Sequence, residues 1–110
     1  VLTMFSPIKI AAAVVNQTPM DWERNVQHHL DAIAEAKTQG VSLLCFPELS
    51  ITGYGCEDMF YAPGLTATAA EMLLRIAEAS RGIMVSVGLP IRYNHRLYNA
   101  SCFISDGEIQ

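Results

Sequence analysis

The chain has 110 residues, with seven Lys or Arg against eleven Asp or Glu, so its formal charge at pH 7 is −4. This acidic balance, without a cluster of basic residues, argues against nucleic-acid binding, which needs cations to contact phosphates. No apolar stretch approaches the ~20 residues of a membrane-spanning helix, and the N-terminal VLTMFS segment is too short for a signal-peptide core. We therefore expect a cytoplasmic protein with no membrane partner.

The cysteine and histidine residues predict neither disulfides nor a metal site. Cys45, Cys56 and Cys102 are odd in number and lack CxxC spacing, so we expect reduced thiols. The three histidines have no second ligand at a metal-binding spacing such as i and i+4. We expect no metal to bind this chain.

The first predicted elements are a strand and a helix. Residues 8–15 form an apolar, β-branched run, which favours a strand in the interior of a sheet. Thr18, Pro19 and Asp21 are start signals for a helix that should stop at Gly40. The apolar residues that recur at helical spacing are Trp22, Val26, Leu30, Ile33 and Ala34.

A carboxylate directly follows the next predicted strand. Residues 41–46 are apolar except for Ser42, a composition typical of a strand buried on both faces. Pro47 cannot donate to a sheet ladder, so it ends the strand and places Glu48 at its carboxyl end, the edge where ligands bind in α/β folds. By spacing alone, such an acid is more often solvated or a cap than catalytic.

The loop after this carboxylate differs from an ordinary connection. Gly53 and Gly55 flank Tyr54 and permit a tightly turned backbone. Glu57 and Asp58 add two carboxylates, which either organise the loop by accepting backbone hydrogen bonds or are solvated charges. We favour the structural role.

A second helix is predicted after Pro63 and Gly64, capped by Thr66 or Thr68 and ending near residues 81–82. Its amphipathic pattern comes from Ala70, Leu73, Leu74, Ile76 and Ala77.

Two more strands are predicted, at residues 83–89 and 97–105, so the element order is βαβαββ. This order indicates an α/β sandwich with parallel and antiparallel neighbours. Asp106 and Gly107 form a tight hairpin turn, but only three residues remain for the returning strand, and the chain does not begin with methionine. We therefore expect a fragment of a longer protein.

The segment FPELSITGY, residues 46–54, resembles the glutamate motif of the carbon-nitrogen hydrolase, or nitrilase, superfamily, whose members fold as an αββα sandwich. The segments GCEDMF and LPIRYNHRLYNASCFISDGEI further resemble the N-terminal glutaminase domain of glutamine-dependent NAD synthetases. The resemblance covers nearly all of the chain. It implies an α/β fold that is part of a nitrilase-like αββα sandwich with a mixed sheet, truncated here, and it makes residues 1–110 the N-terminal portion of that domain.

The resemblance also implies an amidase with a Glu-Lys-Cys triad, in which Glu48 matches the glutamate. Its role would be general base toward a cysteine and then proton donor to the leaving amine, which suits a partly desolvated carboxylate. The family's lysine and cysteine come later in sequence, so Lys9, Lys37 and the three cysteines are not catalytic candidates, and the 110-residue chain alone should be inactive. Tyr54 matches a tyrosine that lines the glutamine pocket, and a packed turn tyrosine is an equal alternative.

In the whole enzyme, the resemblance implies that the ammonia passes to an absent domain, which uses ATP to convert nicotinic acid adenine dinucleotide to NAD. ATP and magnesium belong to that absent domain, and the fragment itself should bind glutamine but no cofactor. Members of the superfamily generally associate, so we expect a homo-oligomer. The residues expected to hold a turn or a subunit contact are Arg92, Tyr93, Arg96 and Tyr98.

Two other functions stay open at this level. The first is a stand-alone carbon-nitrogen hydrolase that acts on a small amide, a carbamoyl compound or a nitrile. The second is a noncatalytic nitrilase-like scaffold. A lysine and then a cysteine beyond Gln110 would favour an enzyme, and the length of the whole protein would separate the synthetase from the stand-alone hydrolase.

Overall fold

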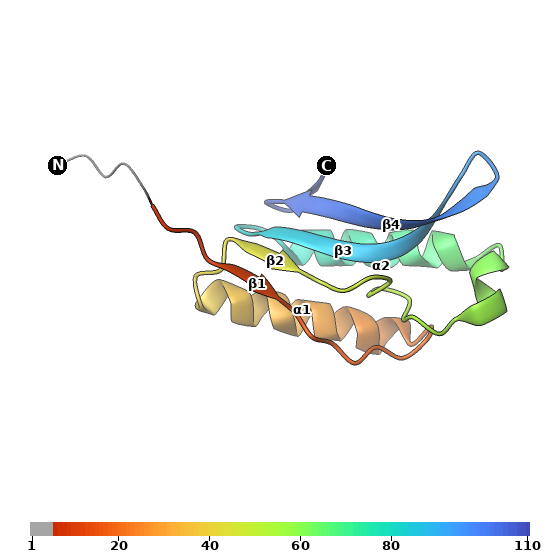
Figure 1. Ribbon diagram of the computed structural model, residues 1–110, viewed down its shortest axis with the longest axis horizontal. Helices are drawn as coiled ribbons and strands as arrows, with labels where there is room; N and C mark the ends of the chain where they lie inside the picture. Colours follow the sequence, from red (N-terminus) through yellow and green to blue (C-terminus); the bar gives the residue numbers. More distant parts are fainter. Residues whose placement is uncertain (1–5) are drawn as a thin grey trace.

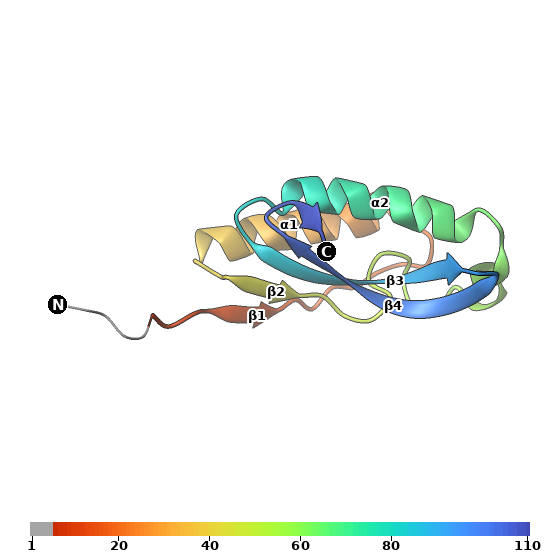
Figure 2. The same ribbon diagram turned by 90° about the horizontal axis from the view of Figure 1, so that it is seen from above.

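The computed structural model describes residues 6–110, which form one sheet with two α-helices against one of its faces (Figure 1; Figure 2). Most of the VLTMFS segment lies outside the described residues. The elements in chain order are β1 (Ile10–Ala12), α1 (Trp22–Thr38), β2 (Leu43–Cys45), the 3₁₀ helix η1 (Glu57–Tyr61), α2 (Leu65–Ala79), β3 (Met84–Tyr93), β4 (Arg96–Ser105) and β5 (Glu108–Ile109).

The sheet is mixed, as its element order predicts. The strands lie side by side in sequence order, β1-β2-β3-β4-β5. β1, β2 and β3 are parallel because a helix connects each to the next, whereas β3, β4 and β5 are antiparallel hairpin neighbours. The returning strand expected after Gly107 is present as β5.

The core lies between the helices and the sheet (Figure 2). Its fully buried side chains include Ile33 of α1, Ile76 of α2 and Val85 of β3. At the surface, the Arg75 guanidinium makes two hydrogen bonds, of 2.9 and 3.1 Å, to the carboxylate of Glu23 and so connects the two helices. The helix layer therefore covers one face of the central strands.

The buried faces of the two helices differ in detail from those predicted. Ala34 and Ala70 are exposed, and Leu74 is 62 % exposed. The buried residues that the pattern missed include Ala36 of α1 and Ala69 of α2. The prediction was wrong at these positions because small apolar residues occur on every side of both helices, and only contact with the sheet selects the buried face.

The second helix begins earlier than predicted. Gly64 is the N-cap and Leu65 the first helical residue, so neither Thr66 nor Thr68 is the cap. Thr68 lies inside the first turn, where both its backbone N–H and its hydroxyl donate to the Gly64 carbonyl at 3.0 Å. Its side chain satisfies a helix carbonyl rather than a free N–H group.

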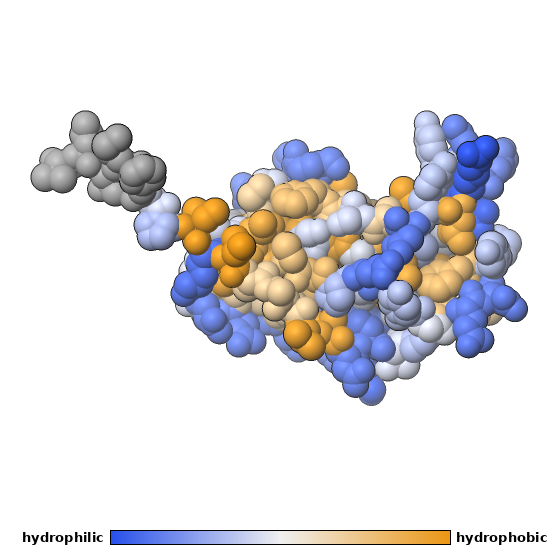
Figure 3. All heavy atoms as spheres, viewed as in Figure 1, coloured by the Kyte–Doolittle hydropathy of each residue, from blue (hydrophilic) through white to orange (hydrophobic). Residues whose placement is uncertain are grey.

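The face of the sheet opposite the helices is exposed in the described residues, and apolar side chains gather on it (Figure 3). The prediction that residues 41–46 are buried on both faces is therefore wrong here, as Ser42 and Cys45 are exposed while Leu44 and Phe46 are buried. β1 lies at an edge of the sheet, not in its interior. A continuous apolar run indicates a strand whose two faces are both covered, but within residues 6–110 the helices cover only one face of this sheet.

The hairpin of β3 and β4 extends beyond the rest of the sheet (Figure 1). Asn94 and His95 form its turn with positive φ angles of 47° and 65°. The strand predicted to end at residue 89 continues to Tyr93, so the hairpin passes the carboxyl edge of β2. In the described residues, neither α-helix has the length and hydropathy needed to cross a bilayer.

A buried histidine connects α1 to the loop after β2. His29 is fully buried, and its Nδ1 lies 2.7 Å from the carbonyl oxygen of Asn25, while its Nε2 lies 2.9 Å from the hydroxyl of Ser50. Burial lowers the pKa of His29 from 6.5 to about 4, an effect that the neighbouring His28 strengthens and the hydrogen bond to Asn25 opposes. His29 is therefore neutral at pH 7.

We expect stability to fall in mild acid because of this residue. An unfolded chain protonates His29 near pH 6.5 but the folded chain only near pH 4, so between these values the unfolded state binds more protons. Lowering the pH from 7 to 5 should cost about 2 kcal/mol of unfolding free energy. The melting temperature of the full-length protein should fall less over this range in His29→Phe than in the wild type. Equal falls would contradict the expected contribution.

Candidate active site

Glu48 lies at the carboxyl edge of the sheet, as the sequence predicts. The backbone N–H of Phe46 donates to the Ser86 carbonyl at 2.8 Å, which is the last ladder bond between β2 and β3 before Pro47. The next residues form tight turns, with Glu48 exposed and Ser50 buried. Within the described residues Glu48 is thus not desolvated, although partial desolvation would suit a general base.

A glycine of β3 lets the Glu48 turn approach the sheet. A Cβ atom at Gly88 would lie 2.3 Å from the Leu49 nitrogen and 2.8 Å from the Pro47 carbonyl oxygen. Such distances are far inside van der Waals contact, so only glycine permits this packing. Gly88 could not be identified from the sequence, because its only signal was a glycine within an otherwise apolar strand.

Asn99 is a hydrogen-bond partner of the Glu48 carboxylate that was not predicted from the sequence. It lies on β4 opposite Pro90 of β3, and its side-chain amide donates a hydrogen bond to Oε1 of Glu48. The two residues are 51 positions apart, so local spacing could not connect them. The available signal was the resemblance of residues 89–109, which include Asn99, to a glutaminase domain.

Tyr54 also lies next to Glu48. The pKa of its phenol is raised, first by the interaction of its hydroxyl with the Glu48 carboxylate and second by the negative charge of that carboxylate. The Tyr54 side chain is 70 % exposed. Its hydroxyl therefore lies near Glu48 in the described residues, and the role of Tyr54 in a glutamine pocket stays a prediction.

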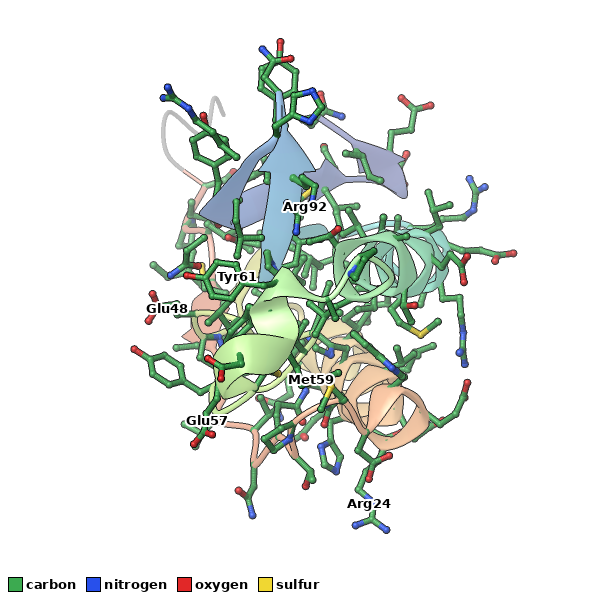
Figure 4. The ribbon with its side chains drawn as sticks, turned by 90° about the vertical axis from the view of Figure 1, so that its right-hand side faces the viewer. Arg24, Glu48, Glu57, Met59, Tyr61 and Arg92 are labelled. Carbon is green, nitrogen blue, oxygen red and sulfur yellow. The ribbon has the colours of Figure 1, made fainter. Side chains whose placement is uncertain are left out.

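Two hollows lie beside Glu48. One, of about 290 Å³, contains the carboxylate, and its lining is Phe46, Pro47, Glu48, Gly88, Asn99, Ala100 and Ser101. The other, of about 310 Å³, lies between η1 and the β3–β4 hairpin, and Asn99 borders both. Figure 4 shows Glu48, Glu57 and Tyr61 on the same side of the molecule, and the last two line the second hollow.

Glu57 and Asp58 lie in the first turn of η1 and are exposed. Neither side chain accepts a backbone hydrogen bond within residues 6–110, which fits the alternative of solvated charges better than the structural role that we favoured. Glu57 has a positive φ of 52°. Its backbone thus helps to turn the chain from the Glu48 loop into η1.

The lysines and cysteines take structural positions. The Lys9 amine donates to the Gln39 carbonyl at 2.8 Å and the Lys37 amine to the Ala79 carbonyl at 2.9 Å. Cys56 is buried, and burial raises the pKa of its thiol and that of Cys102, which disfavours the nucleophilic thiolate. Cys45 lies in β2 and is exposed on the open face of the sheet.

No cluster of three or more His, Cys, Asp or Glu side chains suited to a metal ion occurs in residues 6–110. Arg92, Tyr93, Arg96 and Tyr98 are exposed on the β3–β4 hairpin. Arg92, Tyr93 and Arg96 surround the turn, whereas Tyr98 also lines the hollow between η1 and the hairpin.

The chain belongs to the carbon-nitrogen hydrolase family, whose model matches residues 9–109. It is similar to glutamine-dependent NAD(+) synthetases, with 35 % identity over 104 residues to those of rice and of Saccharomyces cerevisiae. These alignments cover 93 % of the chain but only 14 % and 15 % of the relatives' own lengths.

Solved structures give the same result. The chain is 50 % identical to a glutamine-dependent NAD(+) synthetase from Cytophaga hutchinsonii, with a TM-score of 0.94 over 96 % of this chain and 18 % of that one. An amidase from Nesterenkonia sp. is 26 % identical, with a TM-score of 0.77 over 94 % of this chain and 40 % of the amidase. The fold is that of the nitrilase superfamily, as the sequence predicted.

Proposed function

We propose that residues 1–110 are the N-terminal portion of a glutaminase domain in a longer enzyme. That domain hydrolyses the side-chain amide of glutamine, and the ammonia serves the ATP-dependent amidation of nicotinic acid adenine dinucleotide to NAD. The observation that carries the proposal is Glu48 at the sheet edge, hydrogen-bonded by Asn99 and adjacent to Tyr54, in a chain similar to NAD synthetases along almost its whole length.

In this proposal Glu48 accepts the proton of a cysteine thiol, whose sulfur attacks the amide carbon of glutamine. Glu48 then returns the proton to the departing nitrogen, so ammonia leaves and a thioester remains, which water hydrolyses to glutamate. Asn99 binds one carboxylate oxygen and orients the other toward the reacting groups. The cysteine and the triad lysine come from later parts of the enzyme, so this chain alone is inactive.

ATP and magnesium are assigned to the synthetase part that the relatives imply. The described residues do not fit a metal ion, since they contain no cluster of three ligand side chains. The proposed steps at Glu48 use only protein side chains, glutamine and water. The protein is also proposed to form a homo-oligomer, which the mass of the purified full-length protein in solution would test.

The test is NAD formation by the full-length protein, supplied with ATP, magnesium, nicotinic acid adenine dinucleotide and either glutamine or ammonium. We expect both nitrogen sources to yield NAD. The likeness to the Nesterenkonia amidase favours a stand-alone amidase as the second candidate. That function would be indicated if small amides were hydrolysed without NAD formation, and a lack of both activities would leave the noncatalytic scaffold.

Tyr54→Ala should raise the KM for glutamine about tenfold in the full-length protein, because it removes a wall of the proposed pocket and a hydroxyl group next to Glu48. The melting temperature should stay the same, since the side chain is 70 % exposed. Tyr93→Ala is the matched control, because Tyr93 is 65 % exposed but lies near the hairpin turn. A lower melting temperature with an unchanged KM would show that Tyr54 serves only the turn.

A further inference from the structure

The turn that carries Glu48 has a strained backbone. Leu49, the next residue, has a φ of 51°, in the left-handed region that costs a non-glycine residue about 1 kcal/mol. The chain reverses there, so that Glu48 is exposed whereas Ser50 is 1 % exposed. Such a conformation persists only where surrounding contacts hold it.

His29 contacts the chain on both sides of this strained residue. Its ring packs against the ring of Phe46, two residues before Glu48, with 4.4 Å between the ring centroids. Its Nε2 lies 2.9 Å from the hydroxyl of Ser50, two residues after Glu48. Glu48 itself points away from α1, toward the open side of the site (Figure 4). A single buried side chain thus touches both ends of the five-residue segment centred on the carboxylate.

The directions of the hydrogen bonds follow from the groups involved. The carbonyl oxygen of Asn25 can only accept, so Nδ1 of His29 carries the proton and Nε2 accepts from the Ser50 hydroxyl. The Ser50 oxygen in turn accepts the backbone N–H of Gly88 at 3.2 Å. The Ile51 N–H completes the contact by donating to the Gly88 carbonyl at 3.1 Å. This chain of bonds joins α1 to β3 through the Glu48 turn.

Two amide side chains strengthen the same contact. Gln17 donates to the Ser50 carbonyl at 2.7 Å, and Asn25 donates to the Ile51 carbonyl at 3.2 Å. They act on the backbone carbonyls of Ser50 and Ile51, whereas the His29 side chain contacts both Phe46 and Ser50. Loss of the His29 contacts would therefore weaken the hold on both ends of the segment that carries Glu48.

We propose that His29, acting through Ser50 and Phe46, is a positioning residue that holds Glu48 in the orientation required for glutamine hydrolysis. The inference rests on the proposed glutaminase function. His29 does not touch the reacting atoms, and its effect comes from limiting the displacement of the Glu48 backbone. Because small displacements of a catalytic group lower the rate steeply, the glutamine step should suffer, whereas the ammonia-dependent reaction does not use Glu48.

The experiment compares Ser50→Ala, His29→Phe and the double variant in the full-length protein. For each, kcat with glutamine is divided by kcat with ammonium, so that the ratio does not depend on the fraction of folded enzyme. We expect the ratio to fall about tenfold in either single variant, with the KM for glutamine within about twofold of the wild type. The double variant should lose no more than the worse single variant, because both changes remove the same interaction.

Ser80→Ala is the matched control. Ser80 is another fully buried serine, but its hydroxyl donates to the Ile76 carbonyl at 2.7 Å and it lies at the end of α2. The Ser80→Ala variant should have a lower melting temperature but the same ratio of kcat with glutamine to kcat with ammonium. A ratio within twofold of the wild type in both single variants, or multiplicative losses in the double variant, would overturn the role of His29. A wild-type protein that makes NAD from ammonium but not from glutamine would instead overturn the proposed function, and this inference with it.

Discussion

Glutamine-dependent NAD formation should fall at least ~100-fold when Glu48 is replaced by Gln in the full-length protein, while formation from added ammonium stays close to that of the wild type. The amide keeps the size of the carboxylate but cannot accept the proton of a thiol or return it to the leaving nitrogen. Steady-state rates with each nitrogen source, measured on the same preparation, would check this result.

The matched control is Glu71→Gln, which makes the same chemical change at an exposed position on α2. It should leave both rates unchanged. An equal loss of the glutamine and ammonium reactions in Glu48→Gln would count against a role in glutamine hydrolysis, because it would indicate damage to the whole enzyme. A glutamine rate that stays within a few-fold of the wild type would also remove Glu48 from the proposed mechanism.

Gly88→Ala is expected to impair both stability and glutamine hydrolysis. The added Cβ would lie 2.3 Å from the Leu49 nitrogen and 2.9 Å from the Glu48 carbonyl carbon. These are backbone atoms, so the clash can be relieved only by moving the turn or bending β3. Overpacking of this kind costs about 1–3 kcal/mol, and a displacement of Glu48 by about 1 Å would lower the glutamine rate about 100-fold. Thermal melting and the two NAD assays would measure the two effects separately.

Gly64→Ala is the control for the glycine change itself. No heavy atom lies within 4 Å of a Cβ added at Gly64, and its φ of −86° is accessible to alanine. We expect a change in unfolding free energy of at most about 1 kcal/mol and no change in the glutamine rate. If Gly88→Ala behaved in the same way, the close packing of the Glu48 turn on β3 would not matter for the site.

The extent of β3 shows how tertiary context can reverse a local signal. Pro90 has no backbone N–H, and the strand was predicted to end just before it. The N–H and carbonyl of Gly88, two residues earlier, point toward the β2 side, where Ser50 and Ile51 bind them. Backbone N–H groups two residues apart in a strand point to the same side, so the nitrogen of Pro90 also faces the β2 side. β2 has already ended at that level, so no neighbouring strand requires a donor from Pro90. The strand therefore continues through the proline.

Sequence alone determined the order of the α-helices and strands, the mixed sheet, the end of β2 before Pro47 and the place of Glu48 at the carboxyl edge. These features depend on local properties: hydrophobic period, the missing donor of a proline, and the turn preference of Asp106 and Gly107. They can be read within a window of a few residues, and the resemblance of residues 46–54 to a known motif added the chemistry.

Only the tertiary structure decided which side chains surround Glu48. Asn99 is 51 residues from Glu48 in sequence, and the His29–Ser50 hydrogen bond spans 21 residues. Gly88 matters because the backbone of the Glu48 turn, which follows β2, packs directly against it. None of these pairings has a local signature, since each arises from strand register and helix docking, which depend on the burial of the whole core. The acid is thus encoded locally, whereas its environment is a product of the complete fold.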